Sequence, residues 1–236
     1  MRRCAVRDPR TERRFVPGQT SDESPGLHGL TLALTSTPRP RRGLYVTLYA
    51  RTVAEARLDD FGSGLAPAGD GWFVVNVRDA QWLTSENGEK QPSGSECAFE
   101  SGEFEFPQFG IRLHVLEPGE PNGLYHSESE QEAFLVLSGE CRLLVEGEER
   151  LLRPWDFFHS PARTEHIFVG AGDGPCVILM AGARSEDWRV LYPVSELAAR
   201  YGASAEEETP DPQQAYARFE PSRRERPSYW DRLPWA

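Results

Sequence analysis

A series of short apolar runs between residues 111 and 182 constrains the fold of this chain more than any other feature. Turn-forming residues separate the runs, among them Pro118-Gly119, Gly139, Gly147 and Pro161. Many short strands with turns between them are typical of a β-sandwich or a β-barrel. We therefore predict an all-β domain over residues 110–184. The predicted strands are residues 111–116, 123–127, 132–138, 140–146, 149–153, 156–160, 165–170 and 175–182.

The segment before the predicted barrel, residues 52–109, is expected to supply N-terminal strands and a loop that pack on it. Residues 72–77 (WFVVNV) are β-rich and follow a Gly-Asp-Gly turn, so they are predicted to form a strand. Residues 84–103 are polar and rich in Gly and Ser, which predicts an exposed loop.

The segment after the barrel, residues 185–236, is predicted to be a helical and irregular tail. One short helix is expected at residues 193–201, closed by Gly202. A second is expected to begin at the Asp211-Pro212 pair and to run to about Phe219. The aromatic final segment, SYWDRLPWA, is expected to cover a surface or a partner subunit.

Charge divides the chain into two parts. Residues 1–51 carry ten Arg and four acidic residues, whereas the whole chain has a net charge of −11. The first part lacks any sustained period, which predicts a disordered basic arm, or a start site placed too far upstream. The remainder is strongly acidic and would repel phosphate, so we expect no nucleic-acid partner.

Four cysteines occur, and they form neither a CxxC pair nor a zinc-ligand spacing. Cys141 and Cys176 lie in apolar runs and are expected to be buried thiols, which fits a reducing compartment. No apolar run is long enough to span a membrane, and residues 27–36 do not have the flanks of a signal peptide. These observations predict a cytoplasmic protein without a membrane partner.

Polar side chains that suit metal ions are concentrated in two segments of the predicted barrel. His126 and Glu128 are two residues apart, so they share one face of a strand, and Glu132 opens the next run. His166 follows the turn at Pro161. Such groups inside a barrel are costly when unpaired, and imidazole plus carboxylate suits Fe, Mn, Ni, Co or Zn as the divalent ion.

These two segments resemble the motifs of the cupin superfamily, in particular small single-domain cupins. The first motif is matched by His126, Glu132 and Gly139. The second is matched by Pro154, Asp156, Pro161 and His166. The resemblance covers residues 118–182 and implies a cupin double-stranded β-helix, or jelly-roll barrel, that holds a divalent metal ion.

The chain departs from the motifs at three positions. Glu128 replaces the second histidine of the first motif, Trp155 replaces the turn glycine of the second, and Gly170 stands where the second motif usually has Asn. The first departure leaves the ligand set open. Glu128 is a metal ligand, a catalytic general base or a surface acid of the hairpin.

The remaining candidates are weighed against plain structural roles. His126, Glu132 and His166 could instead be hydrogen-bonded barrel residues of a cupin that has lost its metal. His114 is expected to be a strand residue that faces solvent, and His159 is a similar case that permits a hydrogen bond to His166. Four aromatic residues flank the ligands and are predicted to line a substrate pocket: Tyr125, Trp155, Phe157 and Phe168.

The resemblance implies two classes of function. The first is an enzyme, dioxygenase-like or isomerase/epimerase-like, that acts on a small molecule through the metal. The alternative is a non-catalytic cupin that binds or senses a small ligand or a metal. An enzyme should have an open cavity with a possible acid or base, whereas a binding module should have a closed or wholly apolar one. The resemblance also implies a homodimer.

Overall fold

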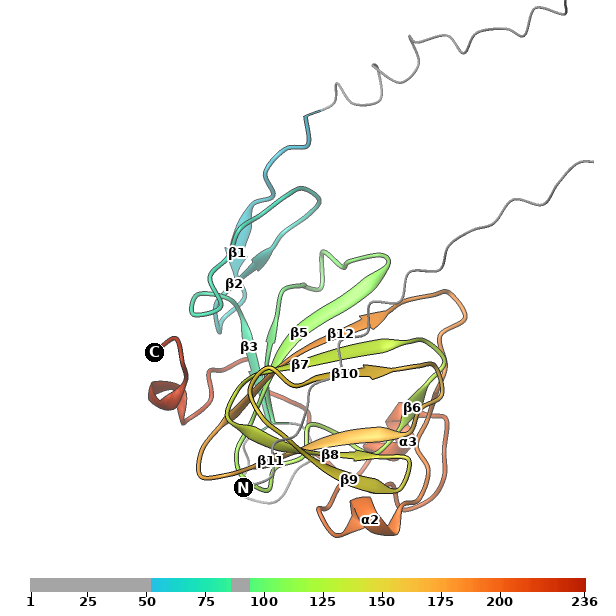
Figure 1. The fold of residues 1–236 in the computed structure, drawn as a ribbon. Helices are drawn as coiled ribbons and strands as arrows, with labels where there is room; N and C mark the ends of the chain where they lie inside the picture. Colours follow the sequence, from blue (N-terminus) through green and yellow to red (C-terminus); the bar gives the residue numbers. More distant parts are fainter. Residues whose placement is uncertain (1–51, 86–93) are drawn as a thin grey trace, which may run out of the picture. The chain divides into compact units, whose positions relative to one another are not determined.

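Most of the regular secondary structure in the described residues is β-strand (Figure 1). The computed structural model describes residues 52–85 and 94–236, so the predicted basic arm lies outside the described residues. The strands are β1 Leu58–Asp60, β2 Leu65–Pro67, β3 Trp82–Thr84, β4 Ser95–Ala98, β5 Phe109–Leu116, β6 Ser127–Glu128, β7 Glu132–Ser138, β8 Glu140–Val145, β9 Glu148–Leu152, β10 Phe157–Ser160, β11 His166–Ala171, β12 Cys176–Ala183 and β13 Val190–Leu191. The helices are α2 Glu196–Ala199, α3 Pro212–Ala215 and the 3-10 turn η1 Trp230–Arg232.

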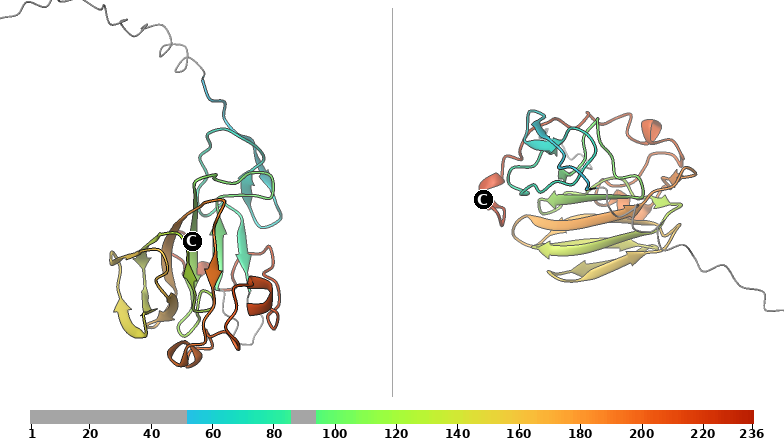
Figure 2. Two further views of the ribbon diagram at one scale, coloured as in Figure 1. Left: turned by 90° about the vertical axis from the view of Figure 1, so that its right-hand side faces the viewer. Right: turned by 90° about the horizontal axis from the view of Figure 1, so that it is seen from above.

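Two antiparallel sheets build the barrel. The larger has the order β10-β7-β12-β5-β4-β3 and the smaller has the order β11-β8-β9 (Figures 1 and 2). Several neighbouring strands are far apart in sequence, as in the β12–β5 pair that aligns Ile178 with His114. This topology confirms the predicted all-β fold class, and every predicted strand except 123–127 lies within two residues of its observed limits.

The core between the sheets follows from the alternation of side chains along each strand. It contains buried residues from both sheets, and no charged residue is among them: Leu116, Phe134, Val136, Cys141, Leu143, Phe168, Cys176 and Ile178. Cys141 and Cys176 are buried free thiols, as the sequence predicted. These side chains fill the space between the two sheets along this part of the barrel.

A second core lies on the outer face of the larger sheet and is closed by the end of the chain. Leu113 and Val115 of β5 point outward here and pack with Trp82, Tyr229 and Leu233. The rings of Trp230 and Trp235 lie 5.3 and 5.5 Å from that of Trp82. The aromatic final segment thus covers a surface of its own barrel, one of the two outcomes expected for it.

Two turns require unusual backbone conformations. Gly139 has φ +71°, and a Cβ there would lie 2.3 Å from the Pro175 carbonyl oxygen. Trp155, which stands at the motif's glycine position, has φ +74°. Its N–H donates to the Val136 carbonyl at 2.7 Å, and the Asp156 N–H closes the turn onto Arg153 at 3.0 Å. These bonds hold the bulky residue in a conformation that disfavours side chains.

The strand predicted at residues 72–77 is not formed. The segment is extended, and its side chains alternate between exposed and half-buried, but only Trp72 makes a bridge, to Glu55. The β-rich run is therefore extended, but among the described residues no neighbouring strand forms a ladder with it. Conversely, β4 lies within the predicted loop 84–103. Its Glu96 faces the inside of the barrel, which made the segment look polar.

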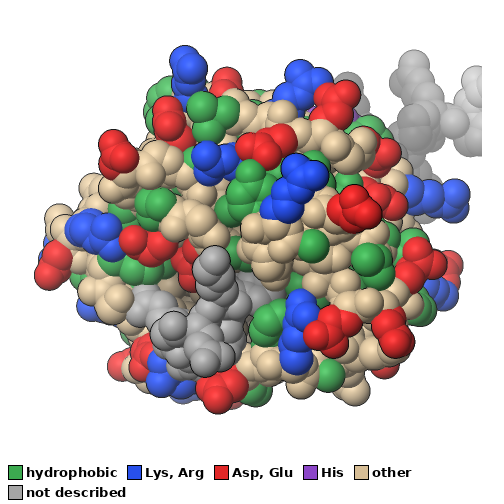
Figure 3. Space-filling view, turned by 90° about the horizontal axis from the view of Figure 1, so that it is seen from below, with side chains coloured by type: hydrophobic (Ala, Val, Ile, Leu, Met, Phe, Trp, Pro, Cys, Tyr) green, Lys and Arg blue, Asp and Glu red, His purple; other side chains and the backbone are tan. Residues whose placement is uncertain are grey.

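The two predicted helices exist but are shorter than expected. The Ser195 side chain caps α2 by accepting from the Ala198 N–H at 3.2 Å. Asp211 caps α3 by accepting from the Gln213 N–H at 2.9 Å. No helix in residues 52–85 and 94–236 is long and apolar enough to cross a bilayer. On the face in Figure 3, acidic and basic side chains are interspersed among the described residues.

Candidate metal centre

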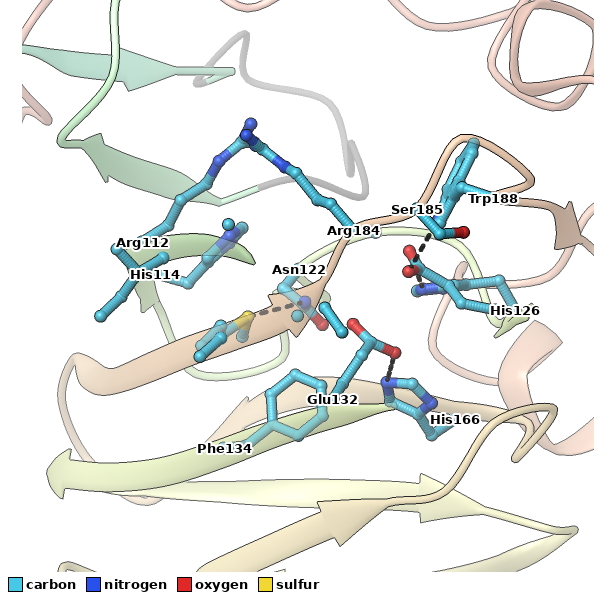
Figure 4. Close-up of a pocket in the computed structure, with 18 of the residues that line it drawn as sticks. Arg112, His114, Asn122, His126, Glu132, Phe134, His166, Arg184, Ser185 and Trp188 are labelled. Carbon is cyan, nitrogen blue, oxygen red and sulfur yellow. Dashed lines mark hydrogen bonds and ion pairs between the residues drawn. The ribbon is translucent and has the colours of Figure 1, made fainter. Parts of the chain in front are cut away.

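A cavity of about 580 Å³ lies beside the apolar core, at the end of the barrel where β5 and β7 begin and β12 ends. Side chains from β5, β6, β7, β11 and β12 line it, together with residues that follow β12 (Figure 4). Its volume lies within the range of roughly 300–1,000 Å³ that is usual for small-molecule sites.

The backbone pairs the two histidines at one side of this cavity. His126 and His166 form an isolated antiparallel bridge, in which the His166 N–H donates to the His126 carbonyl at 2.8 Å. Residues directly opposite in an antiparallel pair project from the same face, so both imidazoles enter the cavity. Glu132 opens β7 opposite Gly182, where the lack of a side chain leaves room for its carboxylate.

His126, Glu132 and His166 bring one ligand atom each to within 4.8 Å of the others. The His166 Nε2 and a Glu132 oxygen are 3.4 Å apart. Two ligands bonded to an ion at about 2.1 Å are at most about 4.2 Å apart, so a small contraction would close the set around an ion. These three residues could therefore hold a metal ion.

Hydrogen bonds fix which nitrogen of each imidazole faces the others. The His126 Nδ1 is 2.7 Å from the Leu124 carbonyl oxygen, and the His166 Nδ1 is 3.0 Å from that of Thr164. A carbonyl only accepts, so in both rings Nδ1 carries the proton and donates. Each Nε2 is then left with a lone pair, which for His166 lies 3.4 Å from a Glu132 oxygen. Metal-binding histidines are commonly oriented in this way.

The charge states of the three residues reflect their burial. Burial, and to a lesser degree the nearby Glu128 carboxylate, together raise the pKa of the Glu132 carboxyl to about 8. Burial lowers the pKa of His166 to about 3, and it also lowers the pKa of His126. Without a metal, the group is therefore uncharged at neutral pH. A divalent cation would favour the ionised carboxylate and the free imidazole lone pairs.

Glu128 lies beside this group without joining it. One of its oxygens is 3.9 Å from the His126 Nε2, and the other accepts a hydrogen bond from the Trp188 Nε1 at 2.8 Å. Trp188 follows β12, and the Val190–Glu128 pair of the short β13–β6 ladder brings it into reach. The carboxylate lines the cavity and is held in one orientation.

Residues 112–182 match the family model of the cupin domain. The chain carries a cupin domain. This match covers both segments from which the resemblance was drawn and all three residues of the candidate metal site. The fold class expected from that resemblance is confirmed by the match together with the observed sheets.

Several solved structures are similar to part of this chain. One is a candidate sugar phosphate isomerase from Acidithiobacillus ferrooxidans ATCC 23270, at 34% identity over 36% of this chain, with a TM-score of 0.35. The chain spans 56% of the length of that protein. Another is a sugar phosphate isomerase from a cupin superfamily, from Silicibacter pomeroyi DSS-3, at 25% identity over 52% of this chain and 82% of that one, with a TM-score of 0.43.

A third similar structure is a DMSP lyase from Ruegeria pomeroyi DSS-3. It is 22% identical over 50% of this chain and 64% of that one, with a TM-score of 0.39. No curated protein matches the chain.

The four aromatic residues predicted to bind substrate do not line the cavity of this cupin barrel. Tyr125 and Phe168 are fully buried in core clusters on either side of the smaller sheet. Trp155 and Phe157 are 74% and 64% exposed, on the turn before β10 and on β10, the edge strand of the larger sheet. They flank the ligands in sequence, but alternation and strand order turn their side chains elsewhere.

Sequence reasoning missed the wall of the cupin cavity that faces the histidines. His114 was expected to face solvent, but it lines the cavity with Arg112 on the same face of β5. The sequence signal for this placement is the apolar pair Leu113 and Val115, which alternates with Arg112 and His114. Leu113 and Val115 occupy the outer core, so the opposite face of β5 turns toward the cavity. His159 is exposed, and Ser160, not His159, lies 3.5 Å from the His166 Nδ1.

Proposed function

We propose that this protein is a divalent-metal enzyme that acts on a small molecule, with His126, Glu132 and His166 as the metal ligands. The observation that carries the proposal is the fixed orientation of the two imidazoles. Both Nδ1 atoms are engaged by main-chain carbonyls, so two Nε2 lone pairs and a carboxylate converge without any N–H among them. A proton or a cation must lie between them, and a divalent ion suits all three groups.

The ion would be Fe, Mn, Zn or Ni, and when bound it would polarise a coordinated oxygen of the substrate or of O2. The side chains around it perform the other tasks. The cavity holds the small molecule, and Glu128 is the candidate for proton transfer. Its orientation by Trp188 leaves the oxygen near His126 directed into the cavity, where a general base is useful. This arrangement supports a dioxygenase-like or an isomerase/epimerase-like reaction.

The alternative function is a non-catalytic cupin that binds or senses a ligand or a metal. The character of the cavity favours the enzyme. Its lining includes Glu128, Arg112 and His114 as well as the candidate ligands, so it is neither closed nor wholly apolar. A carboxylate held beside the ligands, yet outside the group, is more useful to a reaction than to storage.

The test begins with metal content. Protein purified without an affinity tag should carry close to one equivalent of a divalent metal, or take it up at micromolar concentration. The absence of both would refute the proposed metal site.

The role of Glu128 is tested in the metal-loaded protein with Glu128→Gln, and with Glu130→Gln as the control. Glu130 lies on the same hairpin, accepts from Ser185 at 2.7 Å and does not line the cavity. In a screen of small substrates, Glu128→Gln should keep the metal and lose turnover, while Glu130→Gln keeps both. Loss of metal in Glu128→Gln would make this residue a ligand instead. Unchanged turnover would remove it from the reaction.

A further inference from the structure

Two arginines lie on the wall of the cavity opposite the three candidate ligands. Arg112 extends from β5 and Arg184 lies just past the end of β12, and both line the cavity with His114. In Figure 4 their side chains extend toward one another, away from His126 and His166. The proposed metal site makes no use of this wall, so its cationic groups require a separate explanation.

Arg184 is fixed by its surroundings. Its two terminal nitrogens donate to the two Glu100 oxygens at 2.6 and 2.9 Å, and one of them also donates to the Phe106 carbonyl at 2.8 Å. The guanidinium also packs against Gly110, where an added Cβ would lie 3.1 Å from it. Glu100 is only 7% exposed, so breaking this pair would leave a buried carboxylate unpaired. Arg184 is therefore a structural residue of the wall.

Arg112 is held much more loosely. Within the described part of the chain, its Nη1 alone is hydrogen-bonded, to the two Glu96 oxygens at 3.1 and 3.4 Å. Among the described residues, no group accepts from its Nε or its Nη2. The side chain is 44% exposed, and exposed ion pairs of this kind contribute little to stability. Glu96 also has the His114 Nε2 at 3.4 Å, so it keeps a neighbour if Arg112 turns away.

We propose that Arg112 binds an anionic group, a carboxylate or a phosphate, of the small molecule that occupies this cavity. A guanidinium presents its donors as a planar fork, which matches two oxygens of such a group. We further infer that the other end of this molecule reaches His126, Glu132 and His166. Only this second statement rests on the proposed function. The substrate class is then a small organic acid or a phosphorylated small molecule with a polar group at its far end.

The test uses the full chain stripped of metal, so that the probes cannot bind an ion. Inorganic phosphate and succinate are titrated separately by calorimetry at constant ionic strength. We expect at least one probe to bind in the millimolar range, and the tighter one identifies the preferred group. Arg112→Gln should weaken that binding about tenfold, because it removes charge-assisted hydrogen bonds.

The matched control is Arg142→Gln. Arg142 also lies on a strand and pairs with a Glu of a neighbouring strand, Glu149, at 3.0 Å. Its side chain is 36% exposed, close to the 44% of Arg112, but it does not line the cavity. A second variant gives the opposite sign. Glu96→Gln removes the competing carboxylate and should tighten probe binding several-fold, whereas Glu149→Gln should leave it unchanged.

Three outcomes would overturn the proposal: neither probe binds, Arg112→Gln binds like the wild type, or Arg142→Gln loses as much affinity as Arg112→Gln. If Arg112→Gln does not fold, Arg112→Lys replaces it. Lysine keeps the positive charge but lacks the planar pair of donors, so Arg112→Lys should weaken probe binding. The factor should be smaller than the factor by which Glu96→Gln tightens it. Metal uptake by Arg112→Gln is measured in parallel. Failure of the metal site leaves these titrations unaffected, so the two proposals fail separately.

Discussion

Replacing Trp155 should reveal how much strain the turn before β10 holds. Trp155 has φ +74°, and hydrogen bonds from its own N–H and from Asp156 fix it there. A residue with a Cβ is destabilised in this region by about 1–2 kcal/mol, whereas glycine is not. Glycine also loses more backbone freedom on folding than alanine does, and this costs about 0.5–1 kcal/mol of stability. Trp155→Gly should therefore be more stable than Trp155→Ala by roughly 1 kcal/mol.

The comparison between the two variants isolates the contribution of the backbone conformation to the free energy of unfolding. The side chain is 74% exposed, and both substitutions remove whatever contacts it makes, so these cancel in the difference. For a domain of this size the expected difference in Tm is about 2–4 °C, which thermal unfolding followed by circular dichroism resolves. Gly147→Ala serves as the converse control, since Gly147 has φ +76° with open space around an added Cβ. If Trp155→Ala is as stable as Trp155→Gly, the turn is unstrained and the reasoning fails.

Three further predictions concern the site and its support. His126→Ala and His166→Ala should each abolish metal uptake while unfolding stays cooperative, and retained stoichiometric metal in either variant would contradict the ligand assignment. In metal-free protein, the raised pKa of Glu132 favours folding below about pH 4.5, and this contribution is lost as the pH rises through about 8. Urea unfolding should thus show the wild type losing stability relative to Glu132→Gln between those pH values, by at most about 1.4 kcal/mol per pH unit, and parallel curves would refute this. Gly170→Ala should lower the free energy of unfolding by about 3 kcal/mol or more, because its Cβ would lie 2.0 Å from the Glu117 carbonyl oxygen. A denaturant unfolding curve that matches the wild type would contradict this and show that the backbone moves to accept the methyl group.

The sequence predicted the barrel and its candidate ligands because both depend on short-range patterns. Apolar runs and turn residues defined the strands, and the spacing of His126, Glu132 and His166 matched a known motif. The orientation of the imidazoles could not be predicted, because it depends on the carbonyls of Leu124 and Thr164. These become acceptors only once the backbone has bent around each histidine.

The rest of the cavity depends on which strands become neighbours. Glu96 was assigned to a loop because β4 has no apolar pattern of its own, and it is a strand residue only through its pairing with β5. Arg112 and Arg184 are 72 positions apart along the chain and share a wall only because β5 pairs with β12. The homodimer stays a prediction. The aromatic residues Tyr229, Trp230 and Trp235, which motivated it, pack on Trp82 of the same chain.

The segment that contains Tyr229 and Leu233 closes a core whose other members lie far upstream. The Tyr229 hydroxyl donates to the Ser95 Oγ at 3.0 Å, and Leu233 packs in the same cluster as Trp82. During synthesis on the ribosome, this outer face of the larger sheet stays open until residues near 235 have left the exit tunnel. Folding of this face is therefore expected to wait until residues 229–235 are available, and until then the exposed Trp82 face is a natural target for chaperones.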